Sequence, residues 1–134
     1  MKTIYLADDD EDDRMLIRIA VEQVISHVQI IELDSGEDLI KLIADQRVSD
    51  DPAMIIMDMN MPRLSGLETL DILKLNNASR HIPVVMLSTT SNRMLVHEAY
   101  ARGVNVFLEK PIHEADFMKL ARTVDTCFLN AQLG

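Results

Sequence analysis

The feature of this sequence that most constrains its fold is a regular alternation of short apolar runs with amphipathic segments. The runs are five or six residues long and rich in Val, Ile, Leu and Met. Runs of this length and composition are typical of strands buried on both faces, and they are too short for most helices. The five predicted strands are Thr3–Ala7, Val28–Leu33, Ala53–Asp58, Pro83–Ser88 and Val104–Leu108.

In the segments between and after these runs, apolar residues recur every three or four positions, as on one face of a helix. Ser35 precedes the second helical pattern as a candidate N-cap. Ser65 precedes the third, and Glu68 follows it at the spacing of a capping box. The fourth covers Asn92–Arg102 and stops at Gly103. The apolar positions of the clearest patterns are Leu16, Ile17, Ala20, Val21 and Val24, then Leu39, Ile40 and Ile43, then Leu67, Leu70 and Leu73, and finally Phe117, Leu120, Ala121, Val124 and Phe128.

Strands that alternate with helices in this way imply βαβ units and a parallel sheet. Because such crossovers are right-handed, the simplest topology is a doubly wound α/β domain with five parallel strands and five helices. The connections are short, and there is no repeat or composition shift. We therefore expect residues 1–134 to form a single domain.

Composition excludes several classes of protein. A hydrophobic content of 48% with 26% charged residues is that of a globular domain. The net charge of −9 argues against nucleic acid binding, because phosphates would be repelled. No apolar run approaches the roughly 20 residues of a membrane span, and the N-terminal segment reaches Asp8 too soon for a secretion signal. Cys127 is the single cysteine, which excludes an internal disulfide and fits a cytoplasmic protein with a small buried thiol.

The segment Met54–Pro62 contains the most informative carboxylate. Its apolar run ends at Asp58, between Pro52 and Pro62. Open α/β sheets bind ligands at the carboxyl ends of their strands, so Asp58 is a candidate functional residue. The alternative is that Asp58 only stabilises the following turn, as carboxylates often do.

Other polar side chains follow the remaining predicted strands. Asp8, Asp9 and Asp10 come after the first strand, Ser88 ends the fourth, and Lys110 follows the fifth. Because the carboxyl ends of parallel strands meet at one edge, these groups should converge with Asp58. Several carboxylates at close quarters require a cation, and Mg²⁺ suits oxygen ligands. One carboxylate could then act as a nucleophile toward phosphorus, with Lys110 and Ser88 stabilising the transferred group.

Each of these residues also has a structural interpretation. Asp8–Asp13 could be a solvated start of a helix, favoured by the helix dipole. Ser88 could cap the next helix, and Lys110 could be a surface lysine before the turn at Pro111. Taken separately these interpretations are as plausible as the functional ones, but they do not explain why complementary groups stand at four strand ends.

The same residues resemble a known family, the receiver domains of two-component response regulators. The matching elements are Asp8-Asp9, Asp58-x-Asn60-Met61-Pro62-x-x-x-Gly66, Ser88-Thr89 and Lys110-Pro111, in this order and over essentially the whole chain. The resemblance implies a flavodoxin-like fold and a phosphoryl group accepted on Asp58 from a histidine kinase or a phosphotransfer protein.

The resemblance also implies a ligand set for Mg²⁺. Asp9 and Asp58 would bind the ion directly, the backbone carbonyl of Asn60 would be a third ligand, and Asp8 would act largely through water. Asp10 and Asp12 enlarge the acidic cluster without an assigned role.

For the remaining residues, the resemblance implies that Lys110 pairs with the phosphoryl group and that Ser88 is the switch hydroxyl. The Lys110–Pro111 peptide bond would be cis, as is usual in the family. Phe107 stands where well-studied members often have Tyr, so it could move between buried and exposed positions but has no hydroxyl to offer a partner. An output protein would then dock on the surface of the fourth helix, fifth strand and fifth helix.

Three alternatives stay open at this point. The output could be a phosphate sink or relay step without a dedicated effector, or the domain could have lost phosphorylation and kept only a binding role. A metal-dependent phosphohydrolase is disfavoured, because Asn60 stands where such an enzyme needs a proton carrier. The four histidines, His27, His81, His97 and His113, lack metal-ligand spacing.

Overall fold

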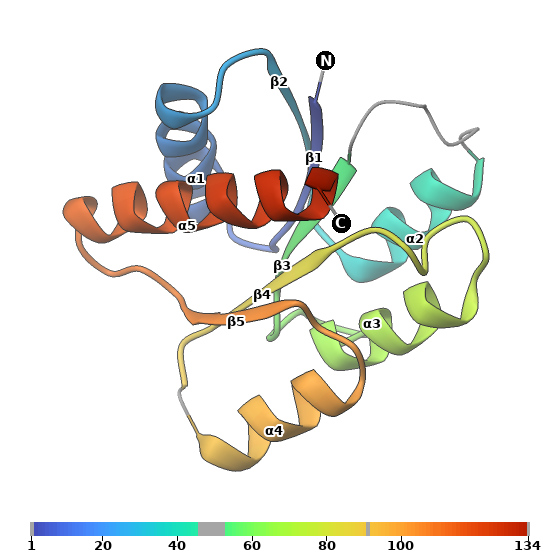
Figure 1. Ribbon diagram of the computed structural model, residues 1–134. Helices are drawn as coiled ribbons and strands as arrows, with labels where there is room; N and C mark the ends of the chain where they lie inside the picture. The colour runs from blue at the N-terminus through green and yellow to red at the C-terminus, as the bar shows by residue number, and fades with distance from the viewer. Residues whose placement is uncertain (1, 46–52, 91, 134) are drawn as a thin grey trace.

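The computed structural model describes residues 2–45, 53–90 and 92–133. Strands and helices alternate along the chain as predicted (Figure 1). The elements are β1 Lys2–Ala7, α1 Glu11–Val24, β2 Val28–Leu33, α2 Gly36–Asp45, β3 Ala53–Asp58, α3 Gly66–Leu75, β4 Val84–Ser88, α4 Arg93–Ala101, β5 Val106–Glu109 and α5 Glu114–Leu133.

All strand pairs are parallel, and the sheet has the order β2-β1-β3-β4-β5. The predicted doubly wound α/β fold is confirmed. The register pairs Ala7 of β1 with both Leu33 and Met57, and Asp58 of β3 with Leu87 of β4. The carboxyl ends of the central strands therefore lie at the same level along one edge of the sheet.

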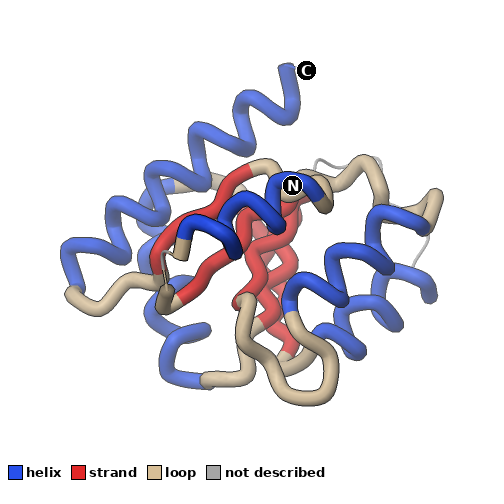
Figure 2. The backbone as a smooth tube through the Cα atoms, turned by 90° about the horizontal axis from the view of Figure 1, so that it is seen from below, coloured by secondary structure: helices blue, strands red, loops and turns tan. Residues whose placement is uncertain are grey.

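Helices cover both faces of this sheet (Figure 2). On one face, Ile17 of α1 and Phe117 of α5 pack against strand residues in one apolar core. On the other, Leu39 of α2, Leu70 of α3 and Ala99 of α4 contribute to a second core. The central strands are buried on both faces, which explains their continuous apolar sequences.

The predicted helix caps are present. The side chain of Ser35 accepts a hydrogen bond from the backbone N–H of Asp38, and Ser65 and Glu68 form the complete capping box. Asn92 caps α4 through the N–H of Met94. The C-terminal end of α4 closes at Gly103, whose φ of 105° lies in the left-handed region that favours glycine.

The predicted boundaries of β5 are wrong by one or two residues. Val104 was assigned to the strand from its apolar side chain, but its N–H donates to Ala99 and so closes the end of α4. Asn105 then exchanges two hydrogen bonds with Val84, one through its backbone N–H and one through its side-chain oxygen. Regular pairing starts only at Val106, next to Val85.

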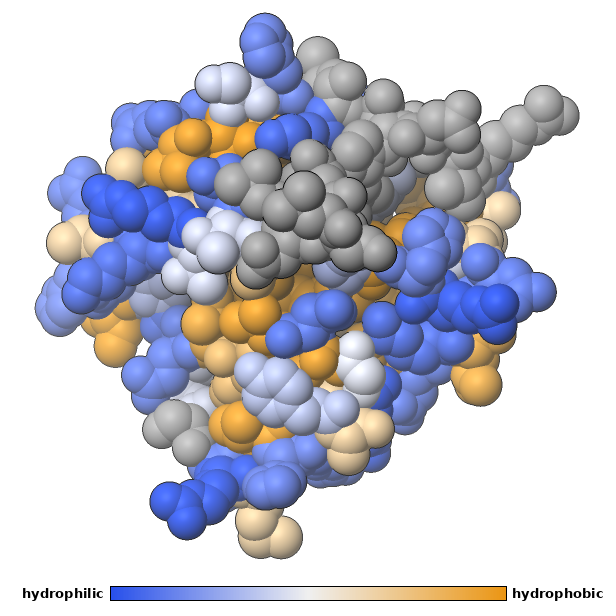
Figure 3. Space-filling view, viewed as in Figure 1, coloured by the Kyte–Doolittle hydropathy of each residue, from blue (hydrophilic) through white to orange (hydrophobic). Residues whose placement is uncertain are grey.

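The face of the molecule in Figure 3 carries mostly hydrophilic residues around separate apolar areas. Cys127 is partly buried and packs against the core under α1 and α5, as expected for a structural thiol. Within the described parts of the chain, no helix combines the length and the apolar character needed to cross a lipid bilayer.

Candidate functional site

The candidate site lies where β1 and β3 end side by side. Asp8 follows β1, Asp58 is the last residue of β3, Ser88 ends β4 and Lys110 follows β5. The helices after β1 and β3 pack on opposite faces of the sheet, so the chain diverges between these two strand ends. Ligands bind at this position in doubly wound folds.

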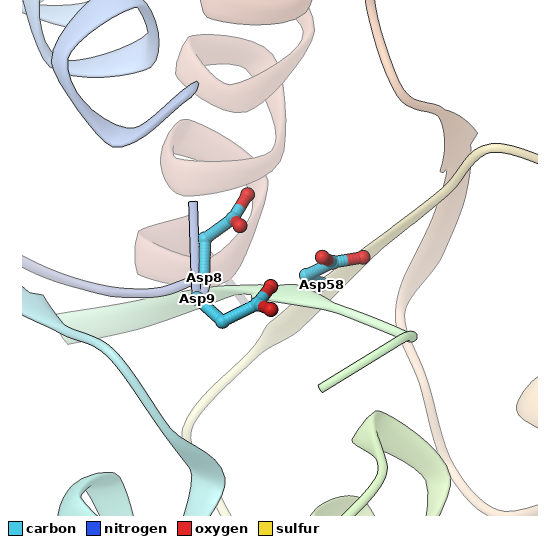
Figure 4. A group of neighbouring side chains, drawn as sticks. All are labelled: Asp8, Asp9 and Asp58. Atoms are coloured by element: carbon cyan, nitrogen blue, oxygen red, sulfur yellow. The ribbon is translucent and has the colours of Figure 1, made fainter. Parts of the chain in front are cut away.

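Three carboxylates converge at these strand ends (Figure 4). One oxygen from each of Asp8, Asp9 and Asp58 lies within 4.8 Å of the others. Asp8 and Asp58 are only 1% and 4% exposed, whereas Asp9 is exposed. Backbone N–H groups hold the two buried side chains: Asp10 donates to Oδ1 of Asp8 at 2.9 Å, and Asn60 donates to Oδ1 of Asp58 at 3.2 Å. The predicted cluster is thus assembled, and its buried members are fixed in orientation.

Lys110 provides the positive charge in the described part of this site. Its Nζ lies 2.9 Å from Oδ2 of Asp8, 2.9 Å from Oδ2 of Asp13 and 3.2 Å from Oδ2 of Asp58. Burial lowers the pKa of Lys110, but the neighbouring carboxylates of Asp13, Asp8 and Asp58 outweigh this and hold the pKa above its ordinary value. Lys110 is therefore a permanent cation here.

One cation does not fully compensate the buried carboxylates. Burial raises the pKa of Asp8 above its ordinary value, and the charge of Asp58 acts in the same direction. Burial also raises the pKa of Asp58, with the charge of Asp9 adding to it. In both cases the hydrogen-bond donors lower the pKa but do not cancel the effect of burial. The site consequently has a surplus of negative charge.

A divalent cation fits this arrangement. Oδ2 of Asp8 is buried and accepts no hydrogen bond among the described residues, even though Lys110 lies nearby. The donor set consists of carboxylate oxygens, which hard cations such as Mg²⁺ prefer. Asp8, Asp9 and Asp58 are the residues that would hold such an ion.

Ser88 ends β4 next to Asp58 and is fully buried. Its hydroxyl oxygen accepts a hydrogen bond from the N–H of Thr90 at 3.2 Å, and its carbonyl accepts one from the N–H of Lys110 at 2.7 Å. The alternative that Ser88 caps the next helix is wrong, because Asn92 is the N-cap of α4, and the Ser88 hydroxyl instead stabilises the turn before that cap. Ser88 therefore connects the site to α4 in this state of the protein.

The loop after Asp58 is held by a close approach at Gly66. The N–H of Gly66 donates to the carbonyl of Met59 at 2.8 Å. A Cβ atom at position 66 would lie 2.7 Å from the Asp58 carbonyl oxygen and 2.8 Å from Sδ of Met86. Only glycine fits there without displacing the backbone that carries Asp58.

Phe107 lies on β5, outside the carboxylate cluster. Its side chain is partly buried against the core under α4, and its backbone N–H donates to the hydroxyl of Tyr100 at 3.1 Å. Tyr100 belongs to α4, so β5 and α4 are joined at the position where the sequence predicts a switch. This packing agrees with a buried Phe107; whether it moves stays a prediction.

The prediction of a cis peptide bond before Pro111 is wrong, because none of the described peptide bonds is cis. The trans isomer of an X–Pro bond is favoured by about 0.5–1 kcal/mol, so neither isomer can be assigned from sequence alone. Lys110 reaches the carboxylates with the trans bond.

Reasoning from strand ends missed Asp13. This residue lies in the first turn of α1, and its carboxylate contacts Lys110. The available signal was the position of the acidic run, because the first turn of a helix that follows β1 must lie beside the end of β1. Asp10, which had no assigned role, is the N-cap of α1 and accepts hydrogen bonds from the N–H groups of Asp12 and Asp13. The prediction of an acidic helix start is therefore also correct.

Comparisons with known proteins agree with one another on the family to which the chain is similar. Residues 4–122 match the response regulator receiver domain family. The response regulator Rcp1 of Synechocystis sp. is 28% identical over 131 residues, which cover 96% of this chain and 89% of Rcp1. The nitrate/nitrite response regulator protein NarL of Escherichia coli is 36% identical over 112 residues, or 81% of this chain; the match spans about half (49%) of NarL. A crystal structure of the Mn²⁺-bound form of Rcp1 has a TM-score of 0.80 at 27% identity and covers 94% of this chain and 93% of that one.

Fold and site together define a doubly wound α/β domain with an acidic cluster at its strand switch point. With the match over residues 4–122, the chain belongs to the response regulator receiver domain family. This is a class of signalling domains, and the resemblance noted in the sequence is confirmed.

Proposed function

We propose that this domain accepts one phosphoryl group on Asp58, in a reaction that requires Mg²⁺. The observation that carries the proposal is the arrangement around Asp58: a buried carboxylate held by the N–H of Asn60, next to two other carboxylates and 3.2 Å from the Lys110 ammonium. A nucleophile, an anionic ion-binding set and a fixed cation are the groups that aspartyl phosphorylation needs.

The proposed donor is a phosphohistidine of a histidine kinase or a phosphotransfer protein. An oxygen of the Asp58 carboxylate forms a bond to phosphorus while the P–N bond to the donor imidazole breaks, and the bonding electrons remain on that nitrogen. Lys110 donates to a phosphoryl oxygen, and the hydroxyl of Ser88 donates to another. Mg²⁺, bound by Asp8, Asp9 and Asp58 with the Asn60 carbonyl as a further ligand, would neutralise negative charge in the site. The Mn²⁺-bound form of the relative Rcp1 supports a divalent ion.

We further propose that phosphorylation acts on an output partner through the surface of α4, β5 and α5. Phe107 and Tyr100 link α4 to β5, and a groove of about 320 Å³ beside Lys110 is formed by residues of β5, α5 and the connection between them. Ile112, in this connection, is 85% exposed and offers apolar area to a partner. Relay of the phosphoryl group to a further protein is the second mode of output. Both roles fit a cytoplasmic domain of residues 1–134.

The decisive experiment is incubation with acetyl phosphate and Mg²⁺, followed by intact mass measurement. We expect an increase of one phosphoryl group in the parent and none in Asp58→Asn, which keeps the shape but removes the nucleophile. Asp12→Asn is the matched control, since Asp12 is exposed in the first turn of α1 and should leave phosphorylation intact. An adduct that persists in Asp58→Asn would move the site to another residue and overturn the assignment.

A further inference from the structure

Lys110 has more partners than the reaction itself requires. Its ammonium has three N–H donors and three carboxylate neighbours, one each from Asp8, Asp13 and Asp58. These carboxylates come from the end of β1, the first turn of α1 and the end of β3. Three carboxylate oxygens thus lie within 3.2 Å of the ammonium, and the Lys110 side chain is only 11% exposed.

Asp13 differs from the other two partners in one respect. Asp8 and Asp58 belong to the three carboxylates that converge as a cation-binding set, and Asp13 does not. When an ion binds to Asp8 and a phosphoryl group forms on Asp58, both residues change their partners. Of the three contacts of Lys110, the one with Asp13 is not affected by these events.

The backbone that carries Asp13 is fixed in the first turn of α1. Its backbone N–H donates to Oδ1 of Asp10, the N-cap of α1, at 3.1 Å. Its side chain is 28% exposed and lies 2.9 Å from the ammonium. Lysine carries its charge on a flexible four-carbon chain, so a second, fixed carboxylate restricts where that charge lies.

We infer that Asp13 is a positioning residue, which holds the Lys110 ammonium over the place where the phosphoryl group arrives. The inference rests on the proposed phosphorylation of Asp58 and adds a residue of α1 to the machinery. A charge that is already in position when a reaction begins stabilises the transition state more than a charge that must first move into place.

The substitution Asp13→Asn tests this inference because positioning and simple electrostatics predict opposite changes in the rate of phosphorylation. Removing one negative charge near the site should by itself speed the uptake of an anionic donor. Loss of positioning should slow it, and we expect at least about a threefold slower rate with acetyl phosphate at saturating Mg²⁺, since misplacing a reacting group costs up to about a hundredfold. Asp12→Asn makes the same charge change in the same helical turn, away from the site, and should be as fast as the parent or faster.

Two further measurements separate positioning from other causes. In a Lys110→Ala background, Asp13→Asn should cause no additional slowing, because the group that it positions is gone. In the unphosphorylated protein with chelator, the ¹H–¹⁵N signal of the Lys110 ammonium should be visible in the parent and in Asp12→Asn, and broadened by hydrogen exchange in Asp13→Asn.

The inference is overturned if Asp13→Asn reacts as fast as Asp12→Asn, or if its ammonium signal equals that of the parent. A parent protein that takes up no phosphoryl group would instead refute the proposed function. In that case the ammonium signal still decides whether Asp13 holds Lys110, so the two failures are distinguishable.

Discussion

At the scale of single residues, Asp8 combines two conflicting requirements. It is almost fully buried, which disfavours its charge, yet its charge is needed to bind a cation. In the metal-free protein this conflict is relieved only in part, by Lys110 and the N–H of Asp10. The domain therefore keeps a local instability at the proposed binding site for the ion and the phosphoryl group.

This instability predicts a particular dependence on pH. Because burial raises the pKa of Asp8 above its ordinary 3.8, the folded protein binds a proton more readily than the unfolded chain. In the metal-free protein the contribution of Asp8 to the free energy of unfolding should rise as pH falls through this raised pKa and be complete below 3.8. Asp8→Asn should be more stable than the parent at pH 7, with the difference shrinking as pH falls.

Urea unfolding with chelator, measured from pH 7 to pH 4, checks this prediction. Comparing the two proteins at each pH removes the contribution of carboxylates with the opposite behaviour, such as Glu68, whose pKa the N–H of Ser65 lowers. Parallel curves for parent and variant would mean that Asp8 does not titrate differently in the folded state.

At the scale of the elements, the end of β4 connects the site to α4. The Ser88 hydroxyl oxygen now accepts the N–H of Thr90, in the turn before α4. If the hydroxyl moves to donate to a phosphoryl oxygen, that contact is lost and the turn changes. The charge-assisted hydrogen bond is worth about 1.5–3 kcal/mol, and burying more of Phe107 contributes up to about 1.5–3 kcal/mol. Their sum approaches the roughly 5.5 kcal/mol that moves an equilibrium from 1:99 to 99:1.

We therefore expect Ser88→Ala to uncouple phosphorylation from α4. Amide chemical shifts of the phosphorylated and free forms should differ around Phe107 and α4 in the parent, and much less in Ser88→Ala. Phe107→Tyr is the matched control and should keep the differences, because it retains the ring on β5. Equally large differences in parent and Ser88→Ala would mean that the signal leaves Asp58 by another route.

The helices and strands were largely predictable from sequence, and the reasons differ between elements. Apolar runs such as 54–57 are buried on both faces, so composition alone identifies them as strands. The boundary at Val104 was not predictable, because an apolar residue that closes a helix looks the same as one that begins a strand. The contact between Asp13 and Lys110 depends on how α1 leaves β1, and the trans isomer at Pro111 depends on tertiary context. Neither is encoded in local spacing.

At the scale of the whole molecule, the acidic site adds to an excess of negative charge, with a net charge of −9. Mg²⁺ can stabilise such a protein in two ways, by specific binding to the carboxylate cluster and by general screening of charge. Only the first requires the carboxylates at the ends of β1 and β3.

Thermal unfolding with increasing Mg²⁺ should separate the two effects. Specific binding should stabilise the parent by about 2.7 kcal/mol at a concentration one hundred times the Kd. Asp9→Asn should lose most of this gain, and Asp12→Asn should retain it. NaCl at matched ionic strength gives the contribution of screening, which all three proteins should share. An equal response of parent and Asp9→Asn to Mg²⁺ would exclude Asp9 as a ligand.

The close approach at Gly66 gives the response of the domain a direction. Through Gly66, the start of α3 packs directly against the backbone of Asp58 and Met59, and the N–H of Gly66 donates to the Met59 carbonyl. Among the described residues, the turn between β4 and α4 is held instead by a hydrogen bond from the N–H of Thr90 to the Ser88 hydroxyl, a side chain that can rotate. If Asp58 is phosphorylated as proposed, we therefore expect α3 to stay in place against the end of β3, and we expect the change in the turn after Ser88 to reach α4.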